Sequence, residues 1–422
     1  MIDAGDKQFL TRLFDAAVRA ADPTAALAPH LPARPRGRTV VIGAGKGAAQ
    51  MAAAFEDLWD DPVEGIVVTR YGYTAPCRHV RVIEAAHPVP DAAGLAASQA
   101  LFGAVRDLGP DDLVVALICG GGSALLPAPP KGLTLSDEAA LNRALLASGA
   151  PISAMNTIRK QVSGIKGGRL AAAAHPARVV TLVVSDVPGD DPAEVASGPT
   201  VADTRDRATA RRVIESYGIA LPDSVQSHLR SAPEDAPRPD DPDFARDEVR
   251  VIASAALSLE AAARAAEAQG VPAVILSDAI EGEAREVGKV HAALAREVER
   301  KNRPFEKPVV ILSGGETTVT LKDESGRGGR NTEFLLSFAI SIEGAAGVAA
   351  LAADTDGIDG SEDNGGAFAD GTTASRIRAA GHDPAALLAA HDAWGAFDGV
   401  GDLFVPGPTG TNVNDLRAIL VR

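Results

Sequence analysis

The chain repeatedly alternates a short apolar strand, a glycine-rich turn and a helix. Residues 39–42 (TVVI) lead into a glycine turn and then into an alanine-rich helix. Residues 113–118 and 309–312 are apolar runs that end in similar turns. Continuous Val, Ile and Leu strands between helices are typical of parallel sheets covered on both faces. We therefore expect an α/β protein built on a doubly wound, mainly parallel sheet.

One interruption of this pattern predicts the domain boundary. Residues 231–243 are rich in proline and aspartate, a composition that favours an exposed linker or long loop. The alternation of strands and helices then resumes. A length of 422 residues suggests two or three domains. We expect one α/β domain over residues 1–240 and a second, smaller α/β region over residues 241–422.

Composition excludes several classes of protein. The formal net charge of −15 argues against a nucleic-acid binder, which would carry a basic face. Cys77 and Cys119 are far apart, so we expect neither a disulfide framework nor a structural zinc site, and a reducing, cytoplasmic setting fits best. The polar N-terminus and the absence of a long apolar run predict neither a signal peptide nor a membrane span.

Five segments that follow apolar strands are candidates for ligand binding. In open parallel sheets, ligands bind beyond the carboxyl ends of the strands. Glycine lets the backbone approach a phosphate, and the N–H groups of a following helix then face the anion. One such turn is as readily structural as functional, but five together favour a site for a phosphorylated ligand. The segments are residues 43–47, 120–123, 185–191, 313–316 and 354–360.

Two cationic residues in these regions are the leading candidates for binding phosphate. Lys46 follows Gly45 at a helix start, where the macrodipole disfavours a cation unless an anion is bound. Arg330 lies in a glycine-rich loop before a helix, and its planar fork suits a phosphoryl group or a carboxylate. For each residue, the alternative is an ordinary solvated side chain.

Aspartates at strand ends supply candidate bases and metal ligands. Asp186 or Asp190 could orient a substrate hydroxyl or hold Mg²⁺. Residues 354–360 resemble a calcium loop, but Ile358 occupies the fifth position, which needs an oxygen ligand. Asp354 and Asp356 could instead hold Mg²⁺ through water, or simply form a turn. Four lesser candidates, which are structural in most proteins, are His87, Asn156, Arg159 and Lys160.

Other motifs give partial matches. Residues 43–48 fit the dinucleotide fingerprint G-x-G-x-x-A, but the next strand ends in Arg70 instead of an acid. An arginine there could meet a 2′-phosphate, so an NADP-binding interpretation stays open. The Walker pattern is absent, and Leu125 breaks the nucleophile-elbow pattern of serine hydrolases.

Taken together, the motifs resemble the class II glycerate kinases, which are glycerate 2-kinases with a C-terminal MOFRL domain. The resemblance covers nearly the whole chain in the same order. It rests on residues 43–47 (GAGKG), 119–124 (CGGGSA), 155–160 (MNTIRK), 185–190 (SDVPGD), 196–200 (ASGPT), 313–318 (SGGETT), 328–331 (GGRN) and 407–415 (GPTGTNVND).

The resemblance implies ATP-dependent phosphorylation of D-glycerate to 2-phosphoglycerate with a divalent cation such as Mg²⁺. It implies a site in the cleft between a Rossmann-like domain and a MOFRL domain at about residues 305–417. The family's catalytic lysine maps to Lys46 and its catalytic arginine to Arg330, and we expect Asp190 to join them. Phosphate and substrate contacts are expected from Gly45, Gly120, Gly121, Gly122, Ser123, Asn156, Lys160, Gly314, Gly315, Glu316 and Asn414, and metal contacts from Asp186, Asp354 and Asp356.

Two other functions remain open on the sequence. Some members of this family carry a hydroxypyruvate reductase label, and the G-x-G-x-x-A turn with Arg70 is compatible with an NADPH-dependent reductase. A non-catalytic binding protein for a sugar acid or nucleotide is the other alternative. The expected partners are small molecules, D-glycerate and ATP, with no nucleic acid and no membrane. A homodimer is one option for the oligomeric state.

Overall fold

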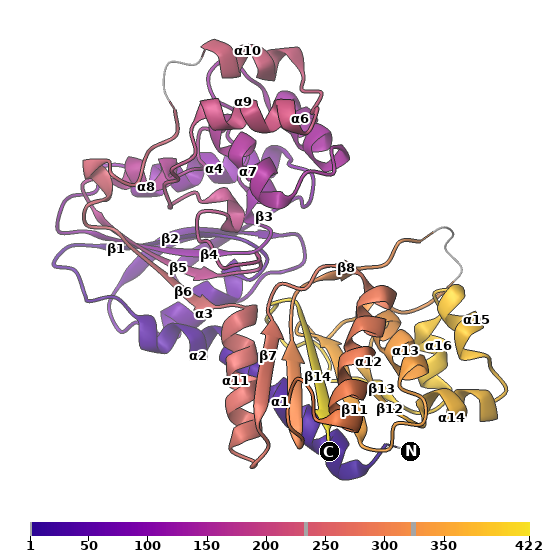
Figure 1. The fold of residues 1–422 in the computed structure, drawn as a ribbon. Coiled ribbons are helices and arrows are strands. Elements are labelled where there is room, and N and C mark those ends of the chain that lie inside the picture. Colours follow the sequence, from indigo (N-terminus) through magenta and orange to yellow (C-terminus); the bar gives the residue numbers. More distant parts are fainter. Residues whose placement is uncertain (1, 232–234, 322–325) are drawn as a thin grey trace. The chain divides into compact units, whose positions relative to one another are not determined.

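The computed structural model describes residues 2–231, 235–321 and 326–422, which form two compact units (Figure 1). The central unit is Pro23–Ile252, and the terminal unit combines Met1–Asp22 with Ala253–Arg422. The boundary expected after residue 240 therefore lies after Ile252. Of the proline- and aspartate-rich stretch that suggested it, positions 232–234 lie outside the described residues.

The first helix does not belong to the unit that follows it in sequence, contrary to the expected domain of residues 1–240. Helix α1 (Ala4–Ala20) packs on α11 (Ala255–Glu267), and both contribute to one apolar core. The Ser258 hydroxyl donates to the Ala17 carbonyl at 3.0 Å. The physical reason is that Phe9, Leu10 and Leu13 of α1 are buried against this core, which the C-terminal sheet provides.

The central unit is built on a six-stranded sheet in the order β3-β2-β1-β4-β5-β6. The pairings from β3 through β5 are all parallel, as the sequence predicts. The strands are β1 (Thr39–Ala44), β2 (Val63–Arg70), β3 (Val80–Ala85), β4 (Leu113–Cys119), β5 (Arg178–Val184) and β6 (Glu248–Ala253). Strands β1 and β4 are buried along their whole length, and their neighbours in the sheet are parallel, so the carboxyl ends of β1, β4 and β5 share one edge.

The helices of the central unit cover the sheet and form a smaller satellite core. Helices α6, α7, α9 and α10 bury their own apolar cluster around Leu141, Ile158 and Val225. The helices are α2 (Pro23–Leu27), α3 (Ala48–Leu58), α4 (Ala92–Val105), α5 (Gly122–Leu125), α6 (Leu135–Ala147), α7 (Ile152–Gln161), α8 (Arg169–Ala174), α9 (Arg207–Ser216) and α10 (Asp223–Ser231), with 3₁₀ turns at Ala28–His30, Val195–Ser197 and Pro242–Phe244.

The terminal unit has a mixed sheet in the order β13-β12-β11-β14-β9-β7. Only β7 and β9 pair in parallel in this sheet; the other pairings are antiparallel, and the C-terminal strand β14 inserts between β9 and β11. The strands are β7 (Ala273–Ser277), β9 (Val309–Ser313), β11 (Val348–Asp354), β12 (Gly366–Asp370), β13 (Leu403–Phe404) and β14 (Asp415–Val421), and β8 (Gly282–Glu283) pairs separately with β10 (Thr317–Thr318).

Two layers of helices cover the faces of this second sheet. Helices α1 and α11 pack on one face, and α12 and α13 contribute to the core on the other. The remaining helices are α12 (Ala284–Lys301), α13 (Arg330–Ser341), α14 (Thr373–Ala379), α15 (Pro384–Ala389) and α16 (Ala393–Asp398). Among the helices of the described residues, none combines the length and apolar character needed to span a bilayer.

A half-buried carboxyl near the end of the central unit gives a testable pH dependence of stability. Burial raises the pKa of Asp247 to about 6, although its carboxylate accepts the Val179 N–H at 2.9 Å. Below pH 6 the native state therefore holds a proton that the unfolded chain releases near pH 4, so this group's contribution to stability falls as pH rises from about 4 to about 6. We expect Asp247→Asn to remove that fall and to raise Tm at neutral pH. Thermal unfolding at several pH values checks this, with the exposed Asp240→Asn as control.

Candidate functional site

Three loops of the central unit meet at the carboxyl edge of its sheet. They follow β1, β4 and β5, as the sequence predicts. The Lys46 N–H donates to the Gly120 carbonyl at 2.8 Å. A Cβ at Gly120 would lie 2.0 Å from Oδ2 of Asp186, and a Cβ at Gly121 would lie 3.2 Å from Cε of Lys46. The side chains of Lys46 and Asp186 are thus both packed against the glycine turn of residues 120–122.

Glycine is required in these turns by close backbone approach. Gly45 has φ of +136°, and a Cβ there would lie 2.4 Å from the Cys119 carbonyl and thiol. The Cys119 sulfur accepts the Gly47 N–H at 3.2 Å. Burial raises the pKa of Cys119 to about 12, so the group stays a neutral thiol and serves packing.

Lys46 is a cation at this edge of the sheet. It is half-buried and takes part in no ion pair among the residues that the structure describes. The nearby His87 has its pKa lowered by burial first and then by the charges of Lys46 and Arg70, which favours a neutral imidazole. An anion bound here would meet a lysine whose charge is not committed to a carboxylate.

A pocket of about 210 Å³ opens beside this loop. Its polar wall contains a chain of hydrogen bonds: the Ser197 hydroxyl donates to Oδ1 of Asn156 at 2.9 Å, and the hydroxyls of Ser123 and Ser197 lie 2.8 Å apart. Because Ser197 donates to Asn156, Ser123 is the donor in the second bond. The lining residues are His87, Pro88, Gly121, Ser123, Ala124, Asn142, Leu146, Ile152, Asn156, Arg159, Asp186, Val187, Glu194 and Ala196.

Lys160 and Asp190 are among the predicted residues that do not line the pocket. Lys160 is fully buried, and its ammonium contacts Glu194 at 3.1 Å and Asp203 at 2.5 Å, so its charge is already balanced. Asp190 lies in the turn after β5 with φ of +53°. Of the carboxylates expected after β5, the structure brings Asp186 to the pocket.

The terminal unit places Arg330 at the first position of α13, in contact with three carboxylates. Nε lies 2.7 Å from Asp415, Nη2 2.6 Å from Asp354, and Nη1 3.2 Å from Glu316. Burial alone would lower the pKa of Arg330, but these acids outweigh it and raise that pKa. The side chains of Asp415 and Asp354 are buried, whereas that of Glu316 is 55% exposed.

The antiparallel insertion of β14 explains this cluster. Asp415 begins β14 and pairs in register with Asp354, the last residue of β11. Farther along, Arg417 is opposite Ser313, the last residue of β9. Arg417 is fully buried and contacts Asp415 at 2.5 Å and the Gly314 carbonyl at 3.1 Å. The start of one strand thus lies where two others end, a position that a search limited to carboxyl ends overlooks.

The remaining predicted residues of the terminal unit are held mainly through their backbones. Gly315 has φ of +104°, and a Cβ there would lie 2.2 Å from the Ile280 nitrogen, so the turn after β9 requires glycine. The Asn414 carbonyl accepts bonds from the N–H and hydroxyl of Thr355, at 3.1 and 2.7 Å. One edge of this sheet therefore contains the predicted residues Gly314, Gly315, Glu316, Arg330 and Asp354. Asp415 and Arg417 lie at the same edge but were not among the predicted site residues.

The carboxylates predicted to hold a metal do not form a cage of their own. Asp354 contacts Arg330 through Oδ2 and accepts the Asp356 N–H through Oδ1 at 3.1 Å. Asp356 accepts the Ile358 N–H at 2.9 Å. Within residues 2–231, 235–321 and 326–422, no group of three or more His, Cys, Asp or Glu side chains is arranged to hold a metal ion.

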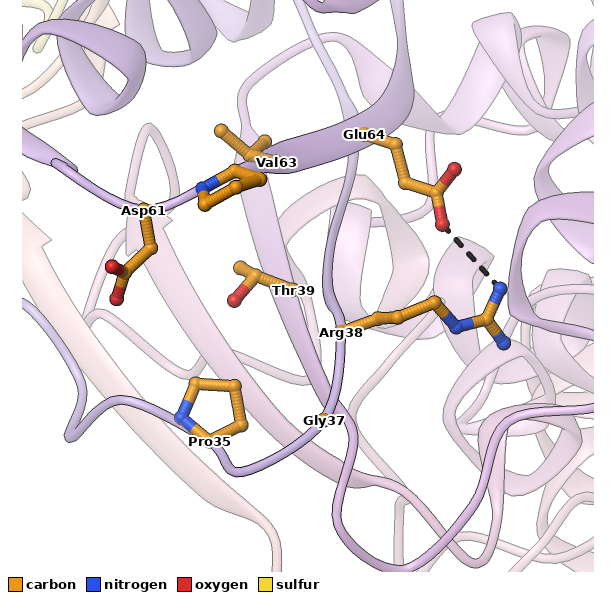
Figure 2. A pocket seen from close by; sticks show the side chains of 8 residues that line it. Pro35, Gly37, Arg38, Thr39, Asp61, Val63 and Glu64 are labelled. Atoms are coloured by element: carbon orange, nitrogen blue, oxygen red, sulfur yellow. Dashed lines mark hydrogen bonds and ion pairs between the residues drawn. The ribbon is translucent and has the colours of Figure 1, made fainter.

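A second pocket of the central unit lies at the opposite edge of the sheet. It measures about 470 Å³ and is lined by residues at the amino ends of β1 and β2, including Thr39 and Val63 (Figure 2). Its arginine, Arg38, is already paired with Glu64 at 3.4 Å. Ligands of parallel sheets bind at the carboxyl ends, so the smaller pocket beside Lys46 is the better candidate despite its size.

Comparisons with known proteins give matches over nearly the whole chain. Residues 9–230 match a family model described as a domain of unknown function (DUF4147), and residues 309–415 match the MOFRL family. A protein of Agrobacterium vitis provisionally named a hydroxypyruvate reductase is 54% identical over 99% of this chain and 95% of its own. A D-glycerate 2-kinase of Thermotoga maritima is 38% identical over 97% of both chains. The crystal structure of a Thermotoga maritima glycerate kinase matches 100% of both chains with a TM-score of 0.91 at 37% identity.

Proposed function

Because the chain belongs to the family of glycerate kinases with a C-terminal MOFRL domain, we propose that it transfers the γ-phosphoryl group of ATP to the C2 hydroxyl of D-glycerate, giving 2-phosphoglycerate and ADP. The observation that carries the proposal is Lys46, a half-buried cation packed on the glycine turn after β4, with no ion pair in the described part of the chain. A kinase needs such a charge to neutralise the transferring phosphoryl group.

The proposed mechanism gives each group one task. The hydroxyl oxygen of glycerate forms a bond to the γ-phosphorus while the bond to the leaving ADP oxygen breaks, and the hydroxyl proton passes to a carboxylate. Asp186 lines the pocket and is our first choice for that carboxylate, with Asp190 second. Lys46 and Arg330 supply positive charge, and backbone N–H groups of the glycine turns contact phosphate oxygens.

The remaining parts of the proposal concern the metal and the setting. A divalent cation such as Mg²⁺ would be held mainly by the nucleotide phosphates, because the described carboxylates offer no complete cage. Cys77 and Cys119 are free thiols, which supports a cytoplasmic, reducing setting. A homodimer stays a proposal that light scattering tests.

The decisive experiment identifies the product. Purified protein is incubated with D-glycerate, ATP and Mg²⁺, and a phosphorus NMR spectrum is recorded. We expect the resonance of 2-phosphoglycerate with stoichiometric ADP. The alternative, an NADPH-dependent hydroxypyruvate reductase, is favoured by the name of the 54% identical relative. Steady NADPH oxidation with hydroxypyruvate, without ADP formation from glycerate, would replace the proposal. In the structure Arg70, which that alternative needs for a 2′-phosphate, is stacked on the ring of Tyr73 at 3.6 Å.

The proposal also predicts that a methyl group on the turn after β4 is harmful. Gly120→Ala would place Cβ 2.0 Å from Oδ2 of Asp186 and displace that carboxylate. We expect kcat to fall about 100-fold, because a displacement of about 1 Å in a reacting group has this effect. Gly103→Ala on α4 is the matched control: nothing lies within 4 Å of the added carbon, and alanine favours the helix. Equal kinase activity in both variants would contradict the assignment of Asp186.

A further inference from the structure

The pocket of the central unit contains a cation that lacks an anionic partner. Arg159 on α7 lines this pocket. Its Nε donates to Oδ1 of Asn142 at 3.0 Å and its Nη1 to Oδ1 of Asn156 at 3.0 Å. It forms no ion pair with any described residue, although it is largely buried and burial lowers its pKa. An arginine in such surroundings is stable only when an anion or several dipoles compensate its charge.

Glu138, the acid whose charge acts on Arg159, already pairs with Lys166 at 3.0 Å, and Glu194 of the pocket wall is neutralised as well. Glu194 accepts bonds from the ammonium of Lys160 at 3.1 Å and from the amide of Asn156 at 2.9 Å, and it also pairs with Arg205. The positive charge of Arg159 is therefore not cancelled by either acid. Arg159 differs in this respect from the adjacent Lys160, whose charge is used in the interior.

The hydrogen bonds of Arg159 fix the plane of its guanidinium group. Asn142 lies on α6 and Asn156 on α7, so two helices hold the Nε and Nη1 positions. Glu194 fixes the amide of Asn156, so that its oxygen faces Arg159. Nη2 makes no hydrogen bond to any described residue and keeps both of its hydrogens for a ligand. A planar group with a free edge suits a carboxylate, which has the matching geometry.

We propose that Arg159 binds the carboxylate of the acceptor and makes this pocket specific for short 2-hydroxy acids. This inference rests on the proposed kinase function and adds to it the residue that recognises the acid. The volume of about 210 Å³ supports a small ligand, because pockets for drug-sized molecules range from about 300 to 1,000 Å³. Ser123 and Asp186 line the same pocket, which makes its wall polar, as the hydroxyls of such an acid require.

The test compares a charged acceptor with its neutral counterpart. Steady-state kinetics are measured with D-glycerate and with D-glyceramide for the unmodified protein, Arg159→Gln, Arg159→Lys and the control Arg143→Gln, an exposed arginine of α6. We expect Arg159→Gln to raise KM for glycerate about 10- to 100-fold, because a hydrogen bond between charged groups has this effect, and to leave KM for ATP and for glyceramide unchanged. Arg159→Lys should recover part of the loss, and Arg143→Gln should match the unmodified protein.

The outcomes separate this inference from the proposed function. Isothermal titration of D-glycerate into each protein reports acid binding without turnover. If the unmodified protein binds glycerate but transfers no phosphoryl group, the kinase proposal fails while Arg159 is still tested by binding. If Arg159→Gln keeps normal affinity for glycerate, or if only KM for ATP rises, the inference is overturned and the arginine binds phosphate or supports the fold. Should Arg159→Gln fail to fold, Arg159→Lys decides by the same comparison.

Discussion

Lys46→Met is expected to lower kcat about 1,000-fold while leaving the protein as stable as before or slightly more stable. The loss follows from the proposed role of Lys46 as a preorganised cation that faces the developing charge of the phosphoryl group. The protein should keep its stability because of where Lys46 lies. It precedes Gly47, the N-cap of α3, where the helix dipole disfavours a positive charge. Methionine keeps the length of the side chain that packs on Gly121. ADP release and thermal unfolding measure the two effects.

A second lysine of the central unit serves as the control. Lys131 is exposed and, unlike Lys46, does not pack on the glycine turn of residues 120–122, so Lys131→Met should retain normal kcat and Tm. Inorganic phosphate or ADP binding gives a further readout, because loss of the cation should weaken both in the Lys46 variant only. Turnover within a few-fold of the unmodified protein would remove Lys46 from the mechanism, whatever its position.

The site in the central unit was accessible to prediction because local rules apply there. Parallel strands bring their carboxyl ends to one edge, so the loops that follow β1, β4 and β5 had to meet. The requirement for glycine at positions 45 and 120 is likewise a local property of turns that approach another backbone or side chain. Sequence spacing therefore identified Lys46, Gly120 and Asp186 as neighbours.

The orientation of neighbouring side chains on one helix could not be predicted from the sequence. Arg159 and Lys160 are adjacent in sequence, and the sequence offered no reason to separate them. In α7 consecutive residues point about 100° apart, so one faces the pocket and the other faces Glu194 and Asp203 in the interior. The positions of Glu194 and Asp203, which are distant from α7 in the sequence, decide which of the two remains available to a ligand.

The terminal unit shows why long-range pairing limits prediction. Asp415 and Arg417 follow a loop and begin a strand, so the rule about carboxyl ends gave no reason to choose them. They reach the charged cluster around Arg330 because the last strand inserts antiparallel between β9 and β11. Helix α1 was assigned to the wrong unit for a related reason: its buried face matches a core formed mostly by residues after position 258.

Arg330→Met is expected to lower both kcat and stability, unlike Lys46→Met. Because we propose Arg330 as a cation that stabilises the phosphoryl group, its removal should reduce kcat about 1,000-fold or more, as for arginines that serve this role in other phosphoryl-transfer enzymes. The variant also leaves the buried Asp354 without its ion-pair partner, whereas Asp415 keeps Arg417, so we expect the free energy of unfolding to drop by about 3 to 5 kcal/mol where Asp354 is ionised. Urea unfolding and ADP release measure the two losses. Arg327→Met, an exposed arginine three residues earlier, is the control.

Adding Asp354→Asn to Arg330→Met separates the loss of stability from the loss of kcat. The pKa of Asp354 also gives the sign of the pH dependence of stability. Burial raises the pKa of Asp354 to about 8, with Arg330 opposing this and Asp415 adding to it. The native state thus holds a proton that the unfolded chain has lost above pH 4, and stability from this group falls as pH rises toward 8. Without Arg330 the ionised carboxylate has no counterion, so the cost of Arg330→Met should be larger at about pH 9 than at about pH 6. Asp354→Asn in the same chain should restore much of the stability and none of the turnover. Recovery of turnover in that double variant would mean that Arg330 acts only by neutralising Asp354, and not on the substrate.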